Sequence, residues 1–146
     1  MKIEIDIDEK YSDVEVDIKA PRLNQDIEKL ISLMRMINMQ IAVKKDDETH
    51  RLDIEKILYI ENVERNTFVY TEDATYESDL KLYEMEQELL EQSFSRISKQ
   101  SIINLKKVKS LKADINRKIR VTLVNGEQII VSRMYSEALR KRLGIK

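Results

Sequence analysis

From residue 41 onward the chain is a series of short runs rich in β-branched and aromatic residues, separated by polar turns. Runs of this composition are typical of pleated sheet. We expect strands at residues 41–44, 57–61, 67–71, 75–77, 108–112, 120–123 and 128–131, with a further short element around 50–52. The pair Asn125-Gly126 predicts a type I′ turn between the last two strands. Residues 41–146 are therefore expected to form one domain that is mostly β with some α (α+β).

Two helices are expected within that domain. Four apolar residues at helical spacing predict a helix over about residues 81–91, and its glutamates form the solvated face. A closing helix is expected at residues 136–143, ended by Gly144. Between the two, residues 94–105 are interpreted as a short basic loop or helical turn that enters a strand or a helix.

The first forty residues are expected to form a separate β/α extension. Apolar and charged residues alternate at 2–8 and again at 14–18, which predicts two half-buried strands. Asn24 or Asp26 can then begin a helix. Its apolar residues, at helical spacing, are Ile27, Leu30, Ile31, Met34 and Ile37. Because so short a unit buries little surface, we expect residues 1–40 either to pack on a second copy or to fold back onto residues 41–146.

Composition excludes several classes of site. The chain has no cysteine, which rules out a disulfide framework, a thiolate nucleophile and a cysteine-based metal centre. Two glycines, Gly126 and Gly144, are too few for the glycine-rich loops that cradle nucleotide phosphates. The single histidine, His50, has no second histidine as a metal partner and no surrounding triad order. We therefore expect no enzyme activity, no metal and no cofactor.

The N-terminal sequence argues against export. In MKIEIDIDEK an acidic residue recurs at every second position, unlike a signal peptide. Nowhere does the chain contain the roughly 18 consecutive apolar residues of a membrane span. We expect a cytoplasmic protein.

Charge is divided unevenly along the chain. Residues 1–94 hold 12 Lys/Arg and 24 Asp/Glu, a balance of −12, whereas residues 95–146 hold 14 Lys/Arg and 3 Asp/Glu, a balance of +11. A basic third of this size can bind a polyanion through release of its counterions. Chance clustering of cations on solvated faces is the alternative.

The basic residues fall in clusters near the ends of the expected elements. They are Arg96 with Lys99, then Lys106, Lys107, Lys109 and Lys112, then Arg117, Lys118 and Arg120, then Arg133, and last Arg140, Lys141 and Arg142. Arginine can contact guanine in the major groove, and lysine or serine can contact phosphate. Only one aromatic residue, Tyr135, lies among them, so duplex DNA is favoured over stacked single strands. A rival hypothesis is a non-catalytic adaptor whose basic face docks an acidic protein.

Several strings in a fixed order carry a resemblance to a known family. They are ILYIE at 57–61 with VYT at 69–71, the run from Leu80 to Leu90 that leads to Phe94, RISKQSIIN at 96–104, NGE at 125–127, and VSRMY at 131–135 before a terminal helix. Together they make residues 41–146 similar to the LytTR family of bacterial DNA-binding domains. The resemblance implies an elongated, antiparallel β fold that inserts loops, instead of a recognition helix, into successive major grooves.

The resemblance also implies where DNA would be contacted. The three base-reading loops fall near Asn66 and Thr67, at Lys99, and at Arg133. Some family members have a histidine in the first loop, so the base preference there stays open. The remaining expected contacts are Ser98, Lys107 and Lys118, together with Arg96, which could bind phosphate or serve as a structural pair.

Forty N-terminal residues cannot hold a phosphate-accepting receiver domain, so the chain is similar to stand-alone LytTR regulators. In these, the N-terminal segment is associated with dimerisation, and some are encoded beside small membrane proteins that restrain them. The expected function is sequence-specific transcription regulation. The expected partners are double-stranded DNA with repeated sites and a second copy of the chain, and the resemblance admits a membrane-protein inhibitor; no small-molecule substrate is expected.

Overall fold

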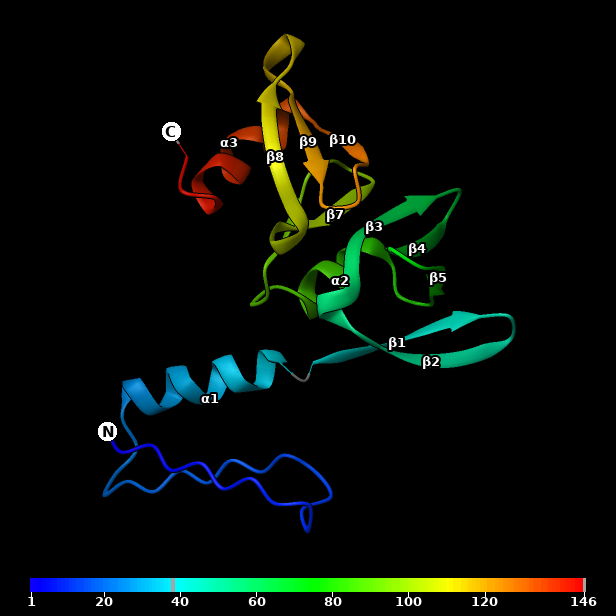
Figure 1. Ribbon diagram of the computed structural model, residues 1–146. Helices are drawn as coiled ribbons and strands as arrows, with labels where there is room; N and C mark the ends of the chain where they lie inside the picture. Colours follow the sequence, from blue (N-terminus) through cyan, green and yellow to red (C-terminus); the bar gives the residue numbers. More distant parts are fainter. Residues whose placement is uncertain (38, 146) are drawn as a thin grey trace.

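Ten strands form two antiparallel sheets in the computed structural model, which describes residues 1–37 and 39–145 (Figure 1). Sheet A has the spatial order β2-β1-β5-β4-β3-β7-β6, and sheet B has the order β10-β9-β8. The strands are β1 (Gln40–Lys45), β2 (Glu48–Asp53), β3 (Ile57–Val63), β4 (Asn66–Thr71), β5 (Thr75–Ser78), β6 (Phe94–Arg96), β7 (Ser101–Asn104), β8 (Val108–Ala113), β9 (Ile119–Leu123) and β10 (Gln128–Val131). The helices are α1 (Gln25–Ile37), α2 (Leu82–Glu88) and α3 (Arg133–Arg142). The expected α+β, mostly antiparallel fold is confirmed.

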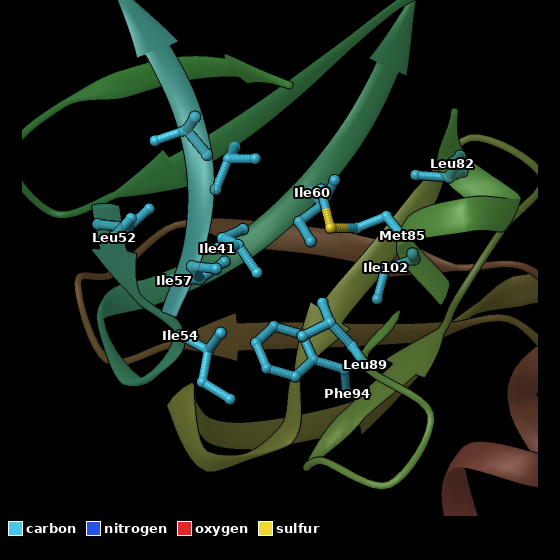
Figure 2. Packing of buried hydrophobic residues seen from close by; sticks show 12 residues of the cluster. Ile41, Leu52, Ile54, Ile57, Ile60, Leu82, Met85, Leu89, Phe94 and Ile102 are labelled. Carbon is cyan, nitrogen blue, oxygen red and sulfur yellow. The ribbon is translucent and has the colours of Figure 1, made fainter. Parts of the chain in front are cut away.

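Two hydrophobic cores lie on opposite faces of strands β3 and β7. Ile57 and Ile102 pack with α2 in the first core (Figure 2), while their neighbours Leu58 and Ile103 pack with sheet B and α3 in the second. Successive side chains of a strand point to opposite faces, so both faces of these two strands are covered. Burying each Ile or Leu stabilises the fold by about 1.5–3 kcal/mol, which makes β3 and β7 the centre of the domain.

Residues 94–104 form the hairpin β6–β7, in which the 98–100 loop enters strand β7, one of the expected alternatives, whereas strand β6 was not expected. All four residues of β7 (Ser101–Asn104) are buried. The strand therefore lacks the alternation of buried and exposed residues that identifies a half-buried strand. The sequence pattern could not decide between strand and helix here, because a strand that is covered on both faces has no polar face to reveal its period.

The turn at Asn125-Gly126 has a different geometry from the one expected. Gly126 has φ 92°, whereas Asn125 is not among the residues with positive φ, and the Gly126 N–H donates to the Leu123 carbonyl. This is a type I turn followed by a left-handed glycine, which also closes a hairpin. Two successive positive φ values, as in a type I′ turn, occur instead at 46–47, 64–65 and 116–117, all without glycine.

Helix α3 begins three residues earlier than expected, at Arg133. Its C-terminus has the expected glycine cap: Gly144 has φ 71°, and the N–H groups of Gly144 and Ile145 donate to the carbonyls of Lys141 and Arg140. This pair of bonds satisfies carbonyls that the last turn leaves free. The earlier start places Arg133 at the first helical position.

The N-terminal extension differs from expectation in its first half. Residues 2–8 and 14–18 form no strands among the described residues, and Ile3, Ile5 and Ile7 are 73–91% exposed. An alternating stretch becomes a half-buried strand only where a partner pairs with it and covers its apolar face. Helix α1 is confirmed, with the Asn24 side-chain oxygen accepting from the Ile27 N–H at 3.0 Å. Figure 1 shows α1 and the segment before it lying apart from both sheets.

None of the helices described is long and apolar enough to span a bilayer.

Candidate nucleic-acid interface

An open groove of about 1060 Å³ lies between the 98–100 loop, the β8–β9 turn and the start of α3. Its cationic lining residues are Lys99, Arg117, Lys118, Arg133 and Arg140. Its acidic lining residues are Asp114 and Glu137. Cations therefore outnumber carboxylates in a concave surface, which concentrates positive potential where a polyanion could bind.

Asp114 does little to reduce that positive potential. The Ile115 backbone N–H donates to its carboxylate at 2.8 Å, and the Arg120 guanidinium lies at 3.1 Å. These contacts, the backbone N–H first, hold the pKa of Asp114 below its usual range. The Asp114 charge is thus used to shape the turn and pair with Arg120, leaving Arg117 and Lys118 exposed at its tip.

The 98–100 loop is anchored on both sides by backbone hydrogen bonds. The Ser132 N–H, next to the start of α3, donates to the Ile97 carbonyl at 2.8 Å. The Asn62 N–H of β3 donates to the Gln100 carbonyl, also at 2.8 Å. Three segments far apart in sequence, the end of β3, the 98–100 loop and the start of α3, therefore lie side by side.

The β3–β4 hairpin extends beyond the 98–100 loop, and its tip is the two-residue turn Glu64-Arg65. Arg65 and Asn66 are exposed, whereas Thr67 is only 4% exposed. Alternation along β4 turns Thr67 toward the protein, so the structure does not present its side chain to a ligand. Arg65 is a cation that was not predicted as a DNA contact from the sequence. Its position in the turn between two expected strands could have identified it.

Arg96 directs its guanidinium toward the protein. Nε donates to the Ser98 carbonyl at 2.7 Å and Nη2 to the Lys99 carbonyl at 2.6 Å, while Nη1 lies 3.1 Å from the Glu86 carboxylate on α2. Ser98 is half-buried, and its hydroxyl accepts from the Gln100 N–H. Lys99, between them, is exposed.

Lys107 is not gathered with the other predicted contacts. It precedes β8, and its carbonyl accepts from the Val124 N–H beside the β9–β10 turn. Lys118 lies past the other end of β8, a strand of six residues that spans about 20 Å at 3.3 Å per residue. The structure brings together Lys99, Lys118 and Arg133, and leaves Lys107 half-buried at the opposite end of sheet B.

Metal-binding geometry is absent from the residues described, where no group of three or more His, Cys, Asp or Glu side chains converges. His50 lies on β2, with Nε2 3.7 Å from the Glu48 carboxylate and its ring edge-on to Tyr76.

Comparisons with known proteins agree with this architecture. A family model described as the LytTr DNA-binding domain matches residues 47–144. An uncharacterized HTH-type transcriptional regulator of Staphylococcus aureus strain MSSA476 is 27% identical over 147 residues, covering 99% of each chain. Its counterpart in strain NCTC 8325 / PS 47 is 26% identical over the same length and coverage.

A solved structure shares the fold. It is the LytTr DNA-binding domain of a Bacillus cereus protein described as a methyl-accepting/DNA response regulator. The two chains are 28% identical with a TM-score of 0.69, and the match covers 73% of this chain and 97% of that one. Because the family model spans most of the chain and the sheets and helices follow the same fold, the chain belongs to the LytTR family of DNA-binding domain proteins.

Proposed function

We propose that this protein is a non-catalytic transcription regulator that binds specific double-stranded DNA sites, with loops entering successive major grooves. One observation carries the proposal: the end of β3, which leads into the 64–66 hairpin tip, the 98–100 loop and the start of α3 lie side by side, and the last two line a groove in which cations outnumber carboxylates. Cations at several loop ends can hold phosphates along a duplex while a few side chains reach base edges.

The proposed roles follow from exposure and position. Arg133, exposed at the first position of α3, reads a base, and Lys99 does so from the middle loop. In the first loop Asn66 and Arg65 take this role, because Thr67 is buried. Lys118 contacts phosphate and adds affinity for any sequence.

We further propose that two copies bind paired sites. The apolar residues of α1 at positions 27, 30, 31 and 34 form one stripe, and Leu30 is 37% exposed. The curated relatives match this chain over 99% of its length, so the extension is common to them. A second copy that covers this stripe would hold two DNA-binding domains together, so that both can bind paired sites.

The proposal is tested by selecting bound duplexes from a random pool with the full chain, in parallel with Arg133→Ala and Arg51→Ala. Arg51→Ala is a matched control, since Arg51 is exposed on β2 in sheet A and outside the groove. We expect the full chain and the control to enrich a repeated motif. Arg133→Ala should weaken the binding free energy for that motif by about 1–3 kcal/mol and change the binding of random DNA little.

Two results would count against the proposal. If Arg133→Ala lost the same amount of affinity for both kinds of DNA, Arg133 would contact only the DNA phosphate backbone and would not read a base. Failure of the full chain to enrich any motif would remove the regulator function and leave the basic groove as a surface for another polyanion.

A further inference from the structure

We infer that Arg96 and Glu86 form a positioning pair that holds the 98–100 loop in its DNA-reading shape. The inference rests on the proposed function and deepens it. It assigns a role in sequence specificity to Glu86, a residue with the same charge sign as DNA, and assigns Arg96 to the loop instead of to phosphate.

The donors of the Arg96 guanidinium are used within the protein. The guanidinium gives one N–H to the Ser98 carbonyl at 2.7 Å, one to the Lys99 carbonyl at 2.6 Å and one to Glu86 at 3.1 Å. The Arg96 side chain is 18% exposed. Because the charge of this guanidinium is paired with a carboxylate and its N–H groups are bonded within the protein, it is poorly placed to bind DNA phosphate.

Hydrogen bonds to the carbonyl groups orient the backbone of the 98–100 loop. Four carbonyls in succession, those of residues 97–100, each accept a hydrogen bond from the protein, and Arg96 supplies the middle two. Carbonyl oxygens that point inward keep their negative ends away from an approaching phosphate backbone. The exposed Lys99 side chain is then the part of the loop that faces outward.

The helix that carries Glu86 is held in place by the first core. Leu82 and Met85 of helix α2, and Leu89 directly after it, pack into the first core, as Figure 2 shows. These three residues are 0–4% exposed. Glu86 therefore projects from a helix that cannot easily move, and its carboxylate holds Nη1 of Arg96 in place. Without that carboxylate, Arg96 would be free to leave the two carbonyls for a DNA phosphate.

This role and simple electrostatics predict different effects of Glu86→Gln on the preference for the selected motif. Removing one negative charge near DNA should tighten binding to every sequence by the same factor if Glu86 acts only through its charge. If Glu86 positions the loop through Arg96, the preference for the selected motif should fall, while binding to unrelated DNA stays the same or tightens.

The experiment measures affinities of the full chain for the selected motif and for a scrambled duplex, with Glu86→Gln, Arg96→Lys and Glu88→Gln. Glu88 is an exposed carboxylate on the same helix and serves as the matched control. We expect Glu86→Gln and Arg96→Lys to lower the ratio of the two affinities about fivefold or more, as loss of one base contact would. Glu88→Gln should leave the ratio unchanged. An unchanged ratio in Glu86→Gln would overturn the inference.

A second readout does not depend on DNA. In the unbound full chain, amide NMR resonances of residues 98–100 should move in Glu86→Gln and stay in place in Glu88→Gln. Resonances that do not move would also overturn the positioning role. If the unmodified chain shows no preference between the two duplexes, the proposed function fails, and the amide resonances alone then decide whether the pair shapes the loop.

Discussion

Lys107 and Lys118 illustrate at the scale of single residues how the fold distinguishes equal charges. Both lie in the basic third of the chain, and the sequence treats them alike. The structure places Lys118 exposed in the β8–β9 turn that lines the groove, and Lys107 half-buried beyond the other end of β8. Each phosphate contact releases counterions, so only a lysine that reaches the duplex contributes to the salt dependence of binding.

We therefore predict different salt dependences for the two alanine variants. Lys118→Ala should reduce the slope of log affinity against log salt by about 0.9 and weaken selected and scrambled duplexes by the same factor. Lys107→Ala removes the same charge and should leave the slope unchanged. Fluorescence anisotropy titrations at several KCl concentrations measure both slopes, and equal changes in the two variants would contradict the separation.

At the scale of elements, Asn104 joins three parts of the domain. Its side chain is 1% exposed at the end of β7. Nδ2 donates to the Ile57 carbonyl at the start of β3 at 2.8 Å. Oδ1 accepts from the Lys106 N–H at 3.0 Å and from the Ser93 hydroxyl at 3.3 Å. One amide thus connects β3, the turn after β7 and the loop between α2 and β6.

Asn104→Ala should lower the free energy of unfolding by about 2–4 kcal/mol, because the buried Ile57 carbonyl and Lys106 N–H would lose their partner. Urea denaturation followed by circular dichroism measures the change. Asn66→Ala, at an exposed asparagine of β4, is the control and should change stability by no more than about 0.5 kcal/mol. A loss in Asn104→Ala as small as in the control would show that these hydrogen bonds are not needed.

At the scale of the whole molecule, the N-terminal extension leaves many of its apolar side chains exposed. Ile3, Ile5, Ile7, Val14, Val16, Ile18 and Leu23 are all exposed. A second copy could pair with these alternating stretches and cover the stripe on α1, and the proposed dimer would then bury surface that is open in a single chain.

We predict that the full chain sediments as a dimer of its 17.3 kDa protomer and that Ile27→Glu with Leu30→Glu makes it monomeric. The two glutamates place charge in the apolar stripe, where burial would be costly. Lys29→Glu, at an exposed position of the same helix, is the control and should leave the dimer intact. Analytical ultracentrifugation measures the masses, and a full chain that sediments as a monomer would exclude this dimer.

The amino-acid pattern by itself determined most strands of residues 41–146, both helices there, helix α1 and the uneven charge. These features depend on neighbours in sequence, through alternation, helical spacing and caps. Arg133 and Lys99 were also identified as candidate contacts from the sequence alone, and their role in DNA binding stays a prediction.

Tertiary structure alone decided the rest. Strand β7 is buried on both faces, and residues 2–8 and 14–18 are not strands because nothing in the described chain pairs with them. Arg96 is directed inward by Glu86 and two carbonyls, and Lys107 is separated from Lys118 by the length of β8. Each outcome depends on which distant residues become neighbours, and local pattern carries no information on such contacts.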